Sequence, residues 1–239
     1  MKKANAPIQR APVLEVIACS VSDAVEAQRG GAGRLEIIRD FDRGGLTPPL
    51  KLVQDILGAV TLPVRVMLRE TDSYEIVGEA EKEKLCAAAS SFSVLNVDGL
   101  VLGFLRNGEI DVQLTERVLS CVPNLNATFH HAFEEAKDPF TAIRLLKRLK
   151  QVDRILTSGG AREWPAKIER LSRYEEHAGP EIEILAGGGI DQQAMRRICQ
   201  ATGIREFHVG RAAREPVSAA GVVRSVRVKA LVETLPESC

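Results

Sequence analysis

The chain has 239 residues, of which 45% are hydrophobic and 27% charged, values that are typical of a globular protein and exclude disorder throughout. Its 32 basic and 32 acidic residues give a formal net charge of zero, which argues against a nucleic-acid partner bound by phosphate neutralisation. No apolar run approaches the roughly 18 residues of a membrane helix, so a membrane partner is not expected either.

The first twelve residues include two lysines and lack the apolar segment of a signal peptide. We therefore expect residues 1–12 to form a flexible arm, residues 13–239 to form one domain, and the protein to be cytoplasmic. The five cysteines are odd in number and contain no CxxC pair. This pattern favours free thiols in a reducing compartment over a disulfide framework.

Short strand-like runs alternate along the chain with longer amphipathic segments. Eight runs predict strands, at residues 13–18, 34–38, 64–69, 97–102, 126–130, 154–158, 181–186 and 205–210. Eight segments predict helices, at residues 22–30, after the Pro48-Pro49 pair, and at 75–90, 111–121, 138–150, 162–177, 191–202 and 217–235. Such alternation is typical of a parallel sheet.

The length decides between two parallel architectures. A (β/α)8 barrel takes about 250 residues, which matches this chain. An open doubly wound sheet would normally carry a GxGxxG turn after its first strand, and none follows residues 13–18. We predict an α/β protein with a single (β/α)8 TIM barrel.

Successive side chains of a strand point to opposite faces, and in the predicted strands one face is apolar and the other is polar. The apolar residues, such as Leu14 and Val16, are expected to face the helices. The alternate residues, expected to face the barrel axis, are Glu15, Arg34, Glu36, Arg65, Met67, Arg69, Asn126, Thr128, His130, Arg154, Glu183, Glu206 and His208. Because buried charges are costly unless paired, this set predicts either an ion-pair network or a wet ligand-binding cavity.

Barrel enzymes place their active sites at the carboxyl ends of the strands. Five of the inward-facing residues are therefore candidate catalytic groups: Glu15, Glu36, Arg69, His130 and His208. A guanidinium is suited to clamp a carboxylate or phosphate, and an imidazole titrates near neutrality. The two glutamates would orient the histidines or form an acid/base pair.

Glycine-rich loops follow the seventh and eighth predicted strands, where barrels commonly bind phosphate. Backbone N–H groups next to glycines can approach an anion closely, although tight turns alone would also use these glycines. The candidate substrate-binding residues of these loops and of the loop after the sixth strand are Thr157, Ser158, Gly187, Gly188, Gly189, Gly210 and Arg211. The ligand they predict is a small anion.

Nine sequence blocks between residues 13 and 212 resemble the CutC family, which is named for copper homeostasis. The blocks are LEV (14–16), GGAGRLE (30–36), GGLTP (44–48), VMLR (66–69), VDGLVLG (97–103), TFHHAF (128–133), RILTSGG (154–160), GGGI (187–190) and EFH (206–208). The resemblance implies a cytosolic TIM barrel, often a homodimer, that binds or handles copper(I).

The resemblance also implies copper(I) ligands, since the family often has cysteines directly after its first two strand motifs. This sequence has Ile17 and Ile38 there, so the missing pair counts against a copper(I) cofactor. Copper(I) prefers soft sulfur ligands, and Cys19 is the one cysteine at the open end of a predicted strand. Cys19 is the candidate metal ligand, with His130 or His208 if these side chains converge.

Three functions remain open from the sequence. The first is the copper(I) protein that the resemblance implies. The second is a barrel enzyme for a small anionic or phosphorylated metabolite, without Schiff-base chemistry, because no lysine lies at the end of a predicted strand. The third is a non-catalytic scaffold, for which a neutral chain with 4% aromatic residues offers no obvious partner surface.

Overall fold

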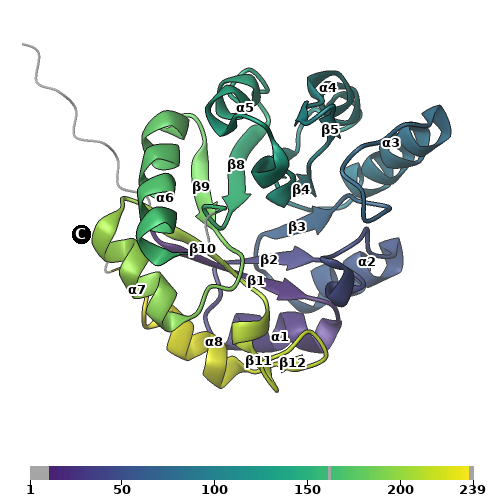
Figure 1. The fold of residues 1–239 in the computed structure, drawn as a ribbon. Coiled ribbons are helices and arrows are strands. Elements are labelled where there is room, and N and C mark those ends of the chain that lie inside the picture. The colour runs from purple at the N-terminus through teal and green to yellow at the C-terminus, as the bar shows by residue number, and fades with distance from the viewer. Residues whose placement is uncertain (1–10, 161–162, 237–239) are drawn as a thin grey trace, which may run out of the picture.

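A computed structural model describes residues 11–160 and 163–236 and contains a closed barrel of parallel strands surrounded by helices (Figure 1). The predicted (β/α)8 TIM barrel is confirmed. Residues 1–10 of the predicted N-terminal arm lie outside the described residues. Within the described ranges, no helix is both long enough and apolar enough to cross a bilayer.

The eight barrel strands correspond to the eight predicted runs. They are β1 (Val13–Ala18), β2 (Arg34–Ile37), β3 (Val64–Met67), β4 (Gly99–Leu102), β7 (Asn126–Phe129), β8 (Val152–Thr157), β9 (Glu183–Ala186) and β10 (Glu206–Val209). Each strand pairs in parallel with its neighbour, and β10 pairs with β1 to close the barrel. Strand β8 begins two residues earlier than predicted, opposite a register irregularity between Ala127 and Thr128.

Helices follow the strands around the outside of the barrel. They are α1 (Val21–Arg29), α2 (Leu50–Ala59), α3 (Glu79–Ser93), α4 (Val112–Ser120), α5 (Pro139–Leu146), α6 (Trp164–Ala178), α7 (Gln192–Ala201) and α8 (Ser225–Val232). Four of them begin after a capping side chain, from Ser20, Asp111, Asp138 or Asp191, that accepts a backbone N–H. Arg162, the predicted start of α6, lies outside the described residues.

Two short hairpins depart from the sequence prediction. The predicted helix over residues 217–235 is wrong in its first part, because β11 (Arg214–Glu215) and β12 (Val222–Val223) form an antiparallel pair. Buried Arg214 holds this hairpin by donating to the carbonyl oxygen of Gly221 at 2.7 Å. The second hairpin, β5 (Leu105–Arg106) with β6 (Glu109–Ile110), was not predicted, since two-residue strands show no periodicity.

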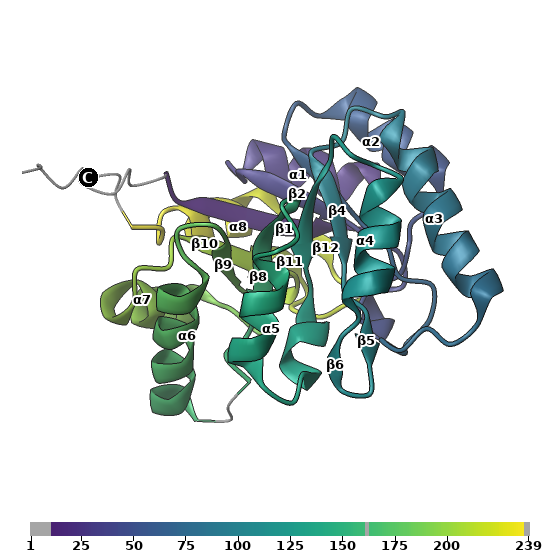
Figure 2. The ribbon, with the colours of Figure 1, turned by 90° about the horizontal axis from the view of Figure 1, so that it is seen from above.

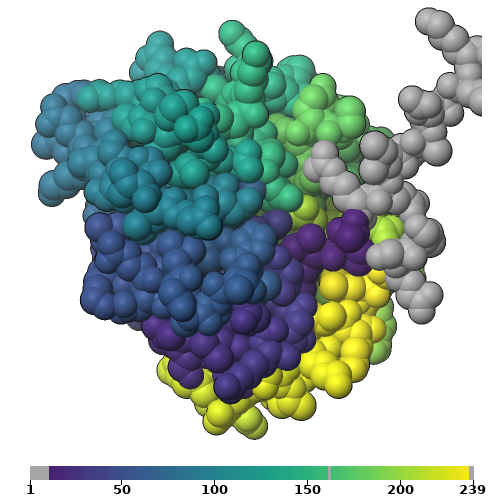
Figure 3. Space-filling view, turned by 180° about the vertical axis from the view of Figure 1, so that it is seen from behind, coloured from purple at the N-terminus to yellow at the C-terminus, as the bar shows by residue number. Residues whose placement is uncertain are grey.

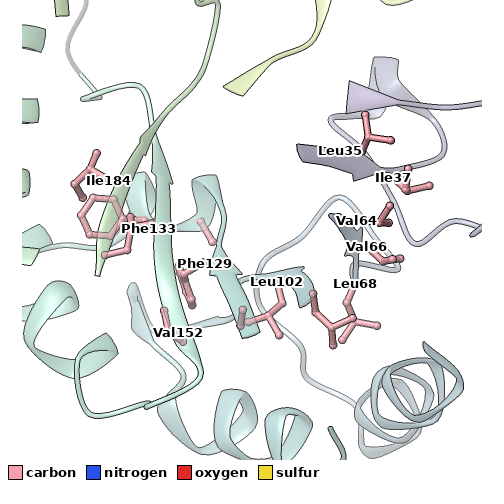
Figure 4. Close-up of a cluster of buried hydrophobic side chains, with 14 of the residues drawn as sticks. Leu35, Ile37, Val64, Val66, Leu68, Leu102, Phe129, Phe133, Val152 and Ile184 are labelled. Atoms are coloured by element: carbon pink, nitrogen blue, oxygen red, sulfur yellow. The ribbon is translucent and has the colours of Figure 1, made fainter. Parts of the chain in front are cut away.

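The apolar face of the strands packs against the helices, as predicted. Figure 4 shows part of this layer, where Leu35 and Ile37 of β2 lie beside Val64 and Val66 of β3. All four side chains are almost completely buried. Each contributes about 1.5 to 3 kcal/mol through the hydrophobic effect, so this outer layer holds the barrel together and leaves the inner face to polar residues.

The barrel closes where the two ends of the chain meet. Strand β1 pairs with β10, and α1 packs against α8, so the purple and yellow parts of the chain lie side by side in Figure 3. A Cβ atom at Gly30, after α1, would lie 2.4 Å from Cβ of Val228 in α8, so only glycine permits this approach. The view from above places α3 and α4 on one side of the barrel and α6 and α7 on the other (Figure 2).

Candidate functional site

Arg65 organises one part of the amino-terminal half of the barrel interior. Its side chain is 0% exposed, and its two terminal nitrogens each donate to a carboxylate oxygen of Asp153 at 2.7 Å. Its Nε donates to Asp98 at 2.8 Å, and it also donates to the hydroxyl of Thr128 at 2.7 Å. A buried guanidinium is stable here because four of its five N–H donors have an acceptor and two carboxylates balance its charge.

A second group of ion pairs lies beside Arg65. Arg34 donates to Glu15 and, at 2.7 Å, to Glu206. Arg154 donates to both oxygens of Glu206 at 2.6 and 2.8 Å. Burial alone would raise the pKa of Glu206, but the two guanidinium groups outweigh it and lower that pKa.

We call these ion pairs the base network. Its members are Glu15, Arg34, Arg65, Asp98, Asp153, Arg154 and Glu206. The predicted ion-pair network is therefore present, and it occupies the half of the interior that lies nearer the amino ends of the strands.

A cavity is also present, at the carboxyl ends of the strands. It has a volume of about 450 Å³, and we call it the mouth cavity. The predicted site residues that line it are Glu36, Arg69, His130, Gly188, Gly189, His208, Gly210 and Arg211. Four of the five candidate catalytic residues thus meet in one space, together with four of the seven candidate ligand-binding residues.

The fifth candidate, Glu15, lies directly beneath the cavity and holds His208. Nδ1 of His208 lies 2.8 Å from Oε1 of Glu15, while Nε2 faces Oε2 of Glu36 at 3.6 Å. Burial alone would lower the pKa of His208, but the carboxylates of Glu36 and Glu15 outweigh it and raise that pKa. Glu15 has its pKa depressed despite burial, because Arg34 and His208 stabilise its carboxylate. This favours an imidazolium at His208.

Glu36 differs from the other buried carboxylates because it has no guanidinium partner. Its side chain is 2% exposed, and its Oε1 atom has no hydrogen-bond partner among the described residues. Burial, with the nearby charge of Glu15, raises the pKa of Glu36 to about 7, although His208 opposes the shift. Glu36 can therefore either take or give a proton near neutral pH.

His130 is a neutral donor at the opposite side of the cavity. Its Nδ1 accepts the backbone N–H of Ala132 at 3.2 Å, which leaves the ring proton on Nε2. Nε2 is buried and has no partner among the described residues. Burial, aided by the charge of Arg69, lowers the pKa of His130 to about 3, so the imidazole stays neutral at any physiological pH. Gly103 makes room for the ring, because a Cβ there would lie 2.5 Å from Nδ1.

Arg69 is held at the rim by backbone and ring contacts rather than by a carboxylate. It donates to the carbonyl oxygen of Asp72 at 2.7 Å, and its guanidinium lies 4.8 Å from the ring centre of Tyr74. Its Nε atom is buried without a partner in the described part of the chain. The guanidinium is thus fixed in orientation and keeps donor capacity for a ligand.

The loop after β9 presents backbone donors to the cavity. Gly188 and Gly189 have φ values of 75° and 83°, in the left-handed region that favours glycine. Their N–H groups donate no hydrogen bond within the described residues, and a Cβ at Gly189 would point into open space. Unpaired N–H groups in a turn that lines a cavity are suited to an anion, whereas Gly187 makes room for Leu156 and His208.

The loop after β8 has a different use. The hydroxyls of Thr157 and Ser158 donate to the carboxylate of Glu134 at 3.0 and 3.1 Å, and the backbone N–H of Ser158 donates to it at 2.5 Å. Burial would raise the pKa of Glu134, but His131 and Ser158 lower it to about 2. The donors of this loop already bind a carboxylate of the chain itself, and neither Thr157 nor Ser158 lines the mouth cavity.

Cys19 does not join the histidines. Its Sγ accepts from Arg214 at 3.5 Å and its backbone N–H donates to Asp23 at 3.0 Å, outside the lining of the mouth cavity. Burial raises the pKa of the Cys19 thiol to about 11 although Arg214 opposes the shift, so a thiolate is disfavoured. Within residues 11–160 and 163–236, no three His, Cys, Asp or Glu side chains form a group that could hold a metal ion.

One thiol contact was missed by the sequence analysis. Cys86 of α3 contacts the thiol of Cys121, at the end of α4, on the outside of the barrel. Burial first, and then Cys121, raises the pKa of Cys86. No spacing in the sequence could reveal this pair, because the two cysteines meet only through the packing of neighbouring helices.

Three residues near the cavity were also missed. The rings of Tyr74 and His130 make a tilted contact with their centres 5.1 Å apart. Phe41 covers the rim at Gly210, where a Cβ would lie 2.3 Å from its ring. Glu134 was not among the predicted site residues, although it directly follows the TFHHAF block. Aromatic residues in the loops after β2 and β3 were the available signal for Phe41 and Tyr74, since loops on this face surround barrel active sites.

Comparisons with known proteins agree on one family. The model of the CutC family matches residues 13–213. The human and mouse copper homeostasis protein cutC homologs are each 34% identical over 197 residues, which is 82% of this chain and 72% of theirs. A solved structure of a CutC protein from Streptococcus agalactiae is 27% identical, with a TM-score of 0.75, and the match covers 83% of this chain and 98% of that one.

Proposed function

The chain belongs to the CutC family, and we propose that it takes part in copper homeostasis by binding a small anionic ligand in the mouth cavity. The names of the human and murine relatives support the cellular role. The ligand-binding part is carried by one observation: Glu36, Arg69 and His130 each keep a buried polar atom without a partner among the described residues. Buried polar groups are nearly always paired, so unpaired ones around a cavity indicate a ligand.

Copper(I) fits the described residues poorly. Cys19 is a single thiol held protonated by burial, and it lies outside the mouth cavity. Ile17 and Ile38, which replace the expected cysteines, pack with Met67 and Val101 in a small apolar cluster inside the barrel. We therefore expect the copper role to depend on the ligand of the mouth cavity rather than on a thiolate site.

A Cu(I) competition titration under reducing, anaerobic conditions tests this separation. We expect wild type, Cys19→Ser and the matched control Cys199→Ser to behave alike and to bind Cu(I) weakly. Tight stoichiometric binding that Cys19→Ser abolishes would contradict the proposal. Tight binding lost instead in Cys86→Ser would place copper at the α3–α4 thiol contact and would contradict it as well.

Copper tolerance of cells that lack this protein tests the cellular role. We expect wild type and Cys19→Ser to restore tolerance, while Glu36→Gln, at equal abundance, does not. Equal tolerance with and without the protein would overturn the role in copper homeostasis and leave the ligand-binding proposal standing.

Thermal denaturation in sulfate or phosphate tests ligand binding directly. A ligand at 100 times its Kd stabilises the folded state by about 2.7 kcal/mol, so the melting temperature of wild type should rise with anion concentration. Arg69→Met should reduce the rise, whereas Arg144→Met, on the exposed surface of α5, should not. An equal rise in all three proteins would contradict binding at the mouth.

A second candidate function is catalysis on that ligand. It is favoured by Glu36, whose pKa of about 7 is a property that catalytic acids and bases require and a passive binding site does not.

A further inference from the structure

From the positions of the unpaired groups around the mouth cavity, we infer that the cavity is a proton-transfer active site for a small carbonyl compound that carries an anionic group. Glu36 is the general base, and His130 is the hydrogen-bond donor to the carbonyl oxygen. The inference rests on the proposed binding of a small anion at the mouth, and it adds the reaction and the chemical class of the substrate.

The first supporting observation is the placement of Glu36. Glu36 belongs to the lining of the cavity, near the end of β2, and its Oε1 atom is buried without a partner among the described residues. Its other oxygen faces Nε2 of His208 at 3.6 Å, a distance too long for a hydrogen bond but short enough for electrostatic attraction. His208 is held in turn by Glu15 at 2.8 Å. Glu36 therefore lies within electrostatic reach of His208, and no hydrogen bond from the described part of the chain occupies its carboxylate.

The second observation is the tautomer of His130. Because Nδ1 accepts a backbone N–H, the proton on Nε2 is the one available to a ligand. A neutral imidazole can donate a hydrogen bond to a developing enolate oxygen. Its N–H is less acidic than that of an imidazolium, so the proton stays on the ring before the reaction. The low pKa of His130 keeps it in this form.

The third observation is the position of the two groups in the barrel. Glu36 comes from β2 and His130 follows β7, with β3 and β4 between them on one side and the other four strands on the other side. They therefore approach the cavity from well-separated directions. The inference places the substrate between them, with a carbon at Glu36 and an oxygen at His130.

The anionic group of the substrate has its own donors. Gly188, Gly189 and Arg69 all line the mouth cavity, and the N–H groups of the two glycines donate no hydrogen bond within the described residues. Arg211, whose guanidinium lies 5.6 Å from the ring centre of Phe41, adds positive charge at the rim. Asp191 also lines the cavity, but its carboxylate caps α7 by accepting the N–H of Ala194 at 2.8 Å.

The reaction balances without a further reagent. The carboxylate of Glu36 removes a proton from the carbon next to the carbonyl group. The electron pair of that C–H bond becomes a C=C bond, and the carbonyl π electrons move to the oxygen, where Nε2–H of His130 stabilises them. Return of the proton from Glu36 to carbon regenerates the carbonyl compound. No lysine lines the mouth cavity in the described residues, so an imine route is not available.

Solvent deuterium exchange measured by NMR at neutral pH tests the inference. The probes are dihydroxyacetone phosphate, fructose 6-phosphate and 2-oxobutanoate, which share a carbonyl group and an anionic group. We expect wild type to exchange the proton next to the carbonyl group of at least one probe. Glu36→Gln should lower that rate at least 100-fold and His130→Asn at least 10-fold, while Glu116→Gln, an exposed control on α4, should leave it unchanged.

Circular dichroism and the melting temperature confirm that each variant is folded before its rate is compared. Exchange that survives Glu36→Gln in a folded protein overturns the inference, and so does the absence of exchange with all three probes. An anion-dependent rise in melting temperature without any exchange would preserve the proposed ligand binding and overturn the catalytic inference alone. Exchange without an effect on copper tolerance would support the inference and overturn the cellular role.

Discussion

The two halves of the barrel interior use the same kinds of residue in opposite ways. On β2, Arg34 belongs to the base network and Glu36, two residues later, belongs to the mouth cavity. On β10, Glu206 belongs to the base network and His208, two residues later, lines the mouth cavity. In the base network each carboxylate contacts a guanidinium, whereas in the mouth cavity Glu36 and His130 each keep an atom without a partner.

The difference shows how one barrel separates stability from chemistry. A buried charged group with all its partners in place neither titrates near neutral pH nor binds a ligand. Its pKa moves away from neutrality, and its hydrogen-bond donors and acceptors are occupied. A buried charge without a full set of partners costs folding free energy, and the same lack of partners leaves it free to react. We therefore expect the base network to control folding and the mouth cavity to control pH dependence and ligand binding.

The largest effect is expected from Arg65→Met. This change removes the shared partner of Asp98 and Asp153 and leaves Thr128 without its donor. Breaking a buried pair from one side typically costs about 3 to 5 kcal/mol, and the partial exposure of both aspartates favours the lower figure. Urea denaturation gives the free energy of unfolding. A loss below about 1 kcal/mol would show that the base network does not carry stability.

An effect of similar size, with the opposite sign and confined to high pH, is expected from Glu36→Gln. The pKa of Glu36 is raised by burial to about 7 from an unfolded value near 4.5, so its stabilising contribution is complete below pH 4.5. That contribution falls as pH rises and is lost above pH 7, a change of about 3 kcal/mol. Glu36→Gln should therefore match wild type near pH 4 and be more stable near pH 8. Parallel pH profiles of the two unfolding free energies would contradict the assignment.

An upward shift in the pKa of Glu36 is expected from His208→Gln. His208 opposes the rise in the pKa of Glu36, while Glu15 from β1 promotes it and Arg34 on β2 opposes it weakly. Removing the imidazolium should move the pKa of Glu36 upward, and the pH profile of deuterium exchange should move to higher pH with it. Carbon-13 NMR of the Glu36 carboxyl group measures the pKa without a substrate. An unchanged or lower pKa would show that His208 does not tune Glu36.

The smallest effect on stability is expected from Arg69→Met. Arg69 contacts backbone carbonyl oxygens and Tyr74 at the rim and makes no ion pair in the described residues. Its loss should change the free energy of unfolding by less than about 1 kcal/mol, since it leaves no buried partner charge. Destabilisation as large as that of Arg65→Met would erase the distinction between the two halves of the interior.

Much of the fold followed from local patterns in the sequence. The alternation of strand and helix segments at this length predicted the barrel, and period two in β1 placed Leu14 and Val16 outward and Glu15 inward. These predictions succeeded because a strand fixes the face of each side chain regardless of its partners. The hairpin at β11 and β12 was missed, because it depends on the distant contact of Arg214 with Asp23 at 2.9 Å.

The candidate site was likewise predicted in part, because some of its features follow from local patterns and others from contacts between distant residues. The sequence identified Glu36, Arg69, His130 and His208, which meet in the mouth cavity. It could not show that Thr157 and Ser158 bind Glu134, because hydroxyl groups in a loop look equally suited to a ligand and to a nearby carboxylate. The sequence also could not show that Cys19 lies away from the histidines. Cys19 contacts Arg214, which is 195 residues away along the chain.

The sequence by itself therefore determined the barrel, the family and most of the inward charged residues, but not Asp98 and Asp153, which pair with Arg65. Only the tertiary structure decided which inward charges are paired and which are left open. The physical reason is that strand periodicity fixes a direction, whereas an ion pair needs two groups at a distance near 3 Å. That distance depends on barrel closure and strand register, which bring Glu15 to His208 across almost the whole chain and leave Glu36 without a guanidinium.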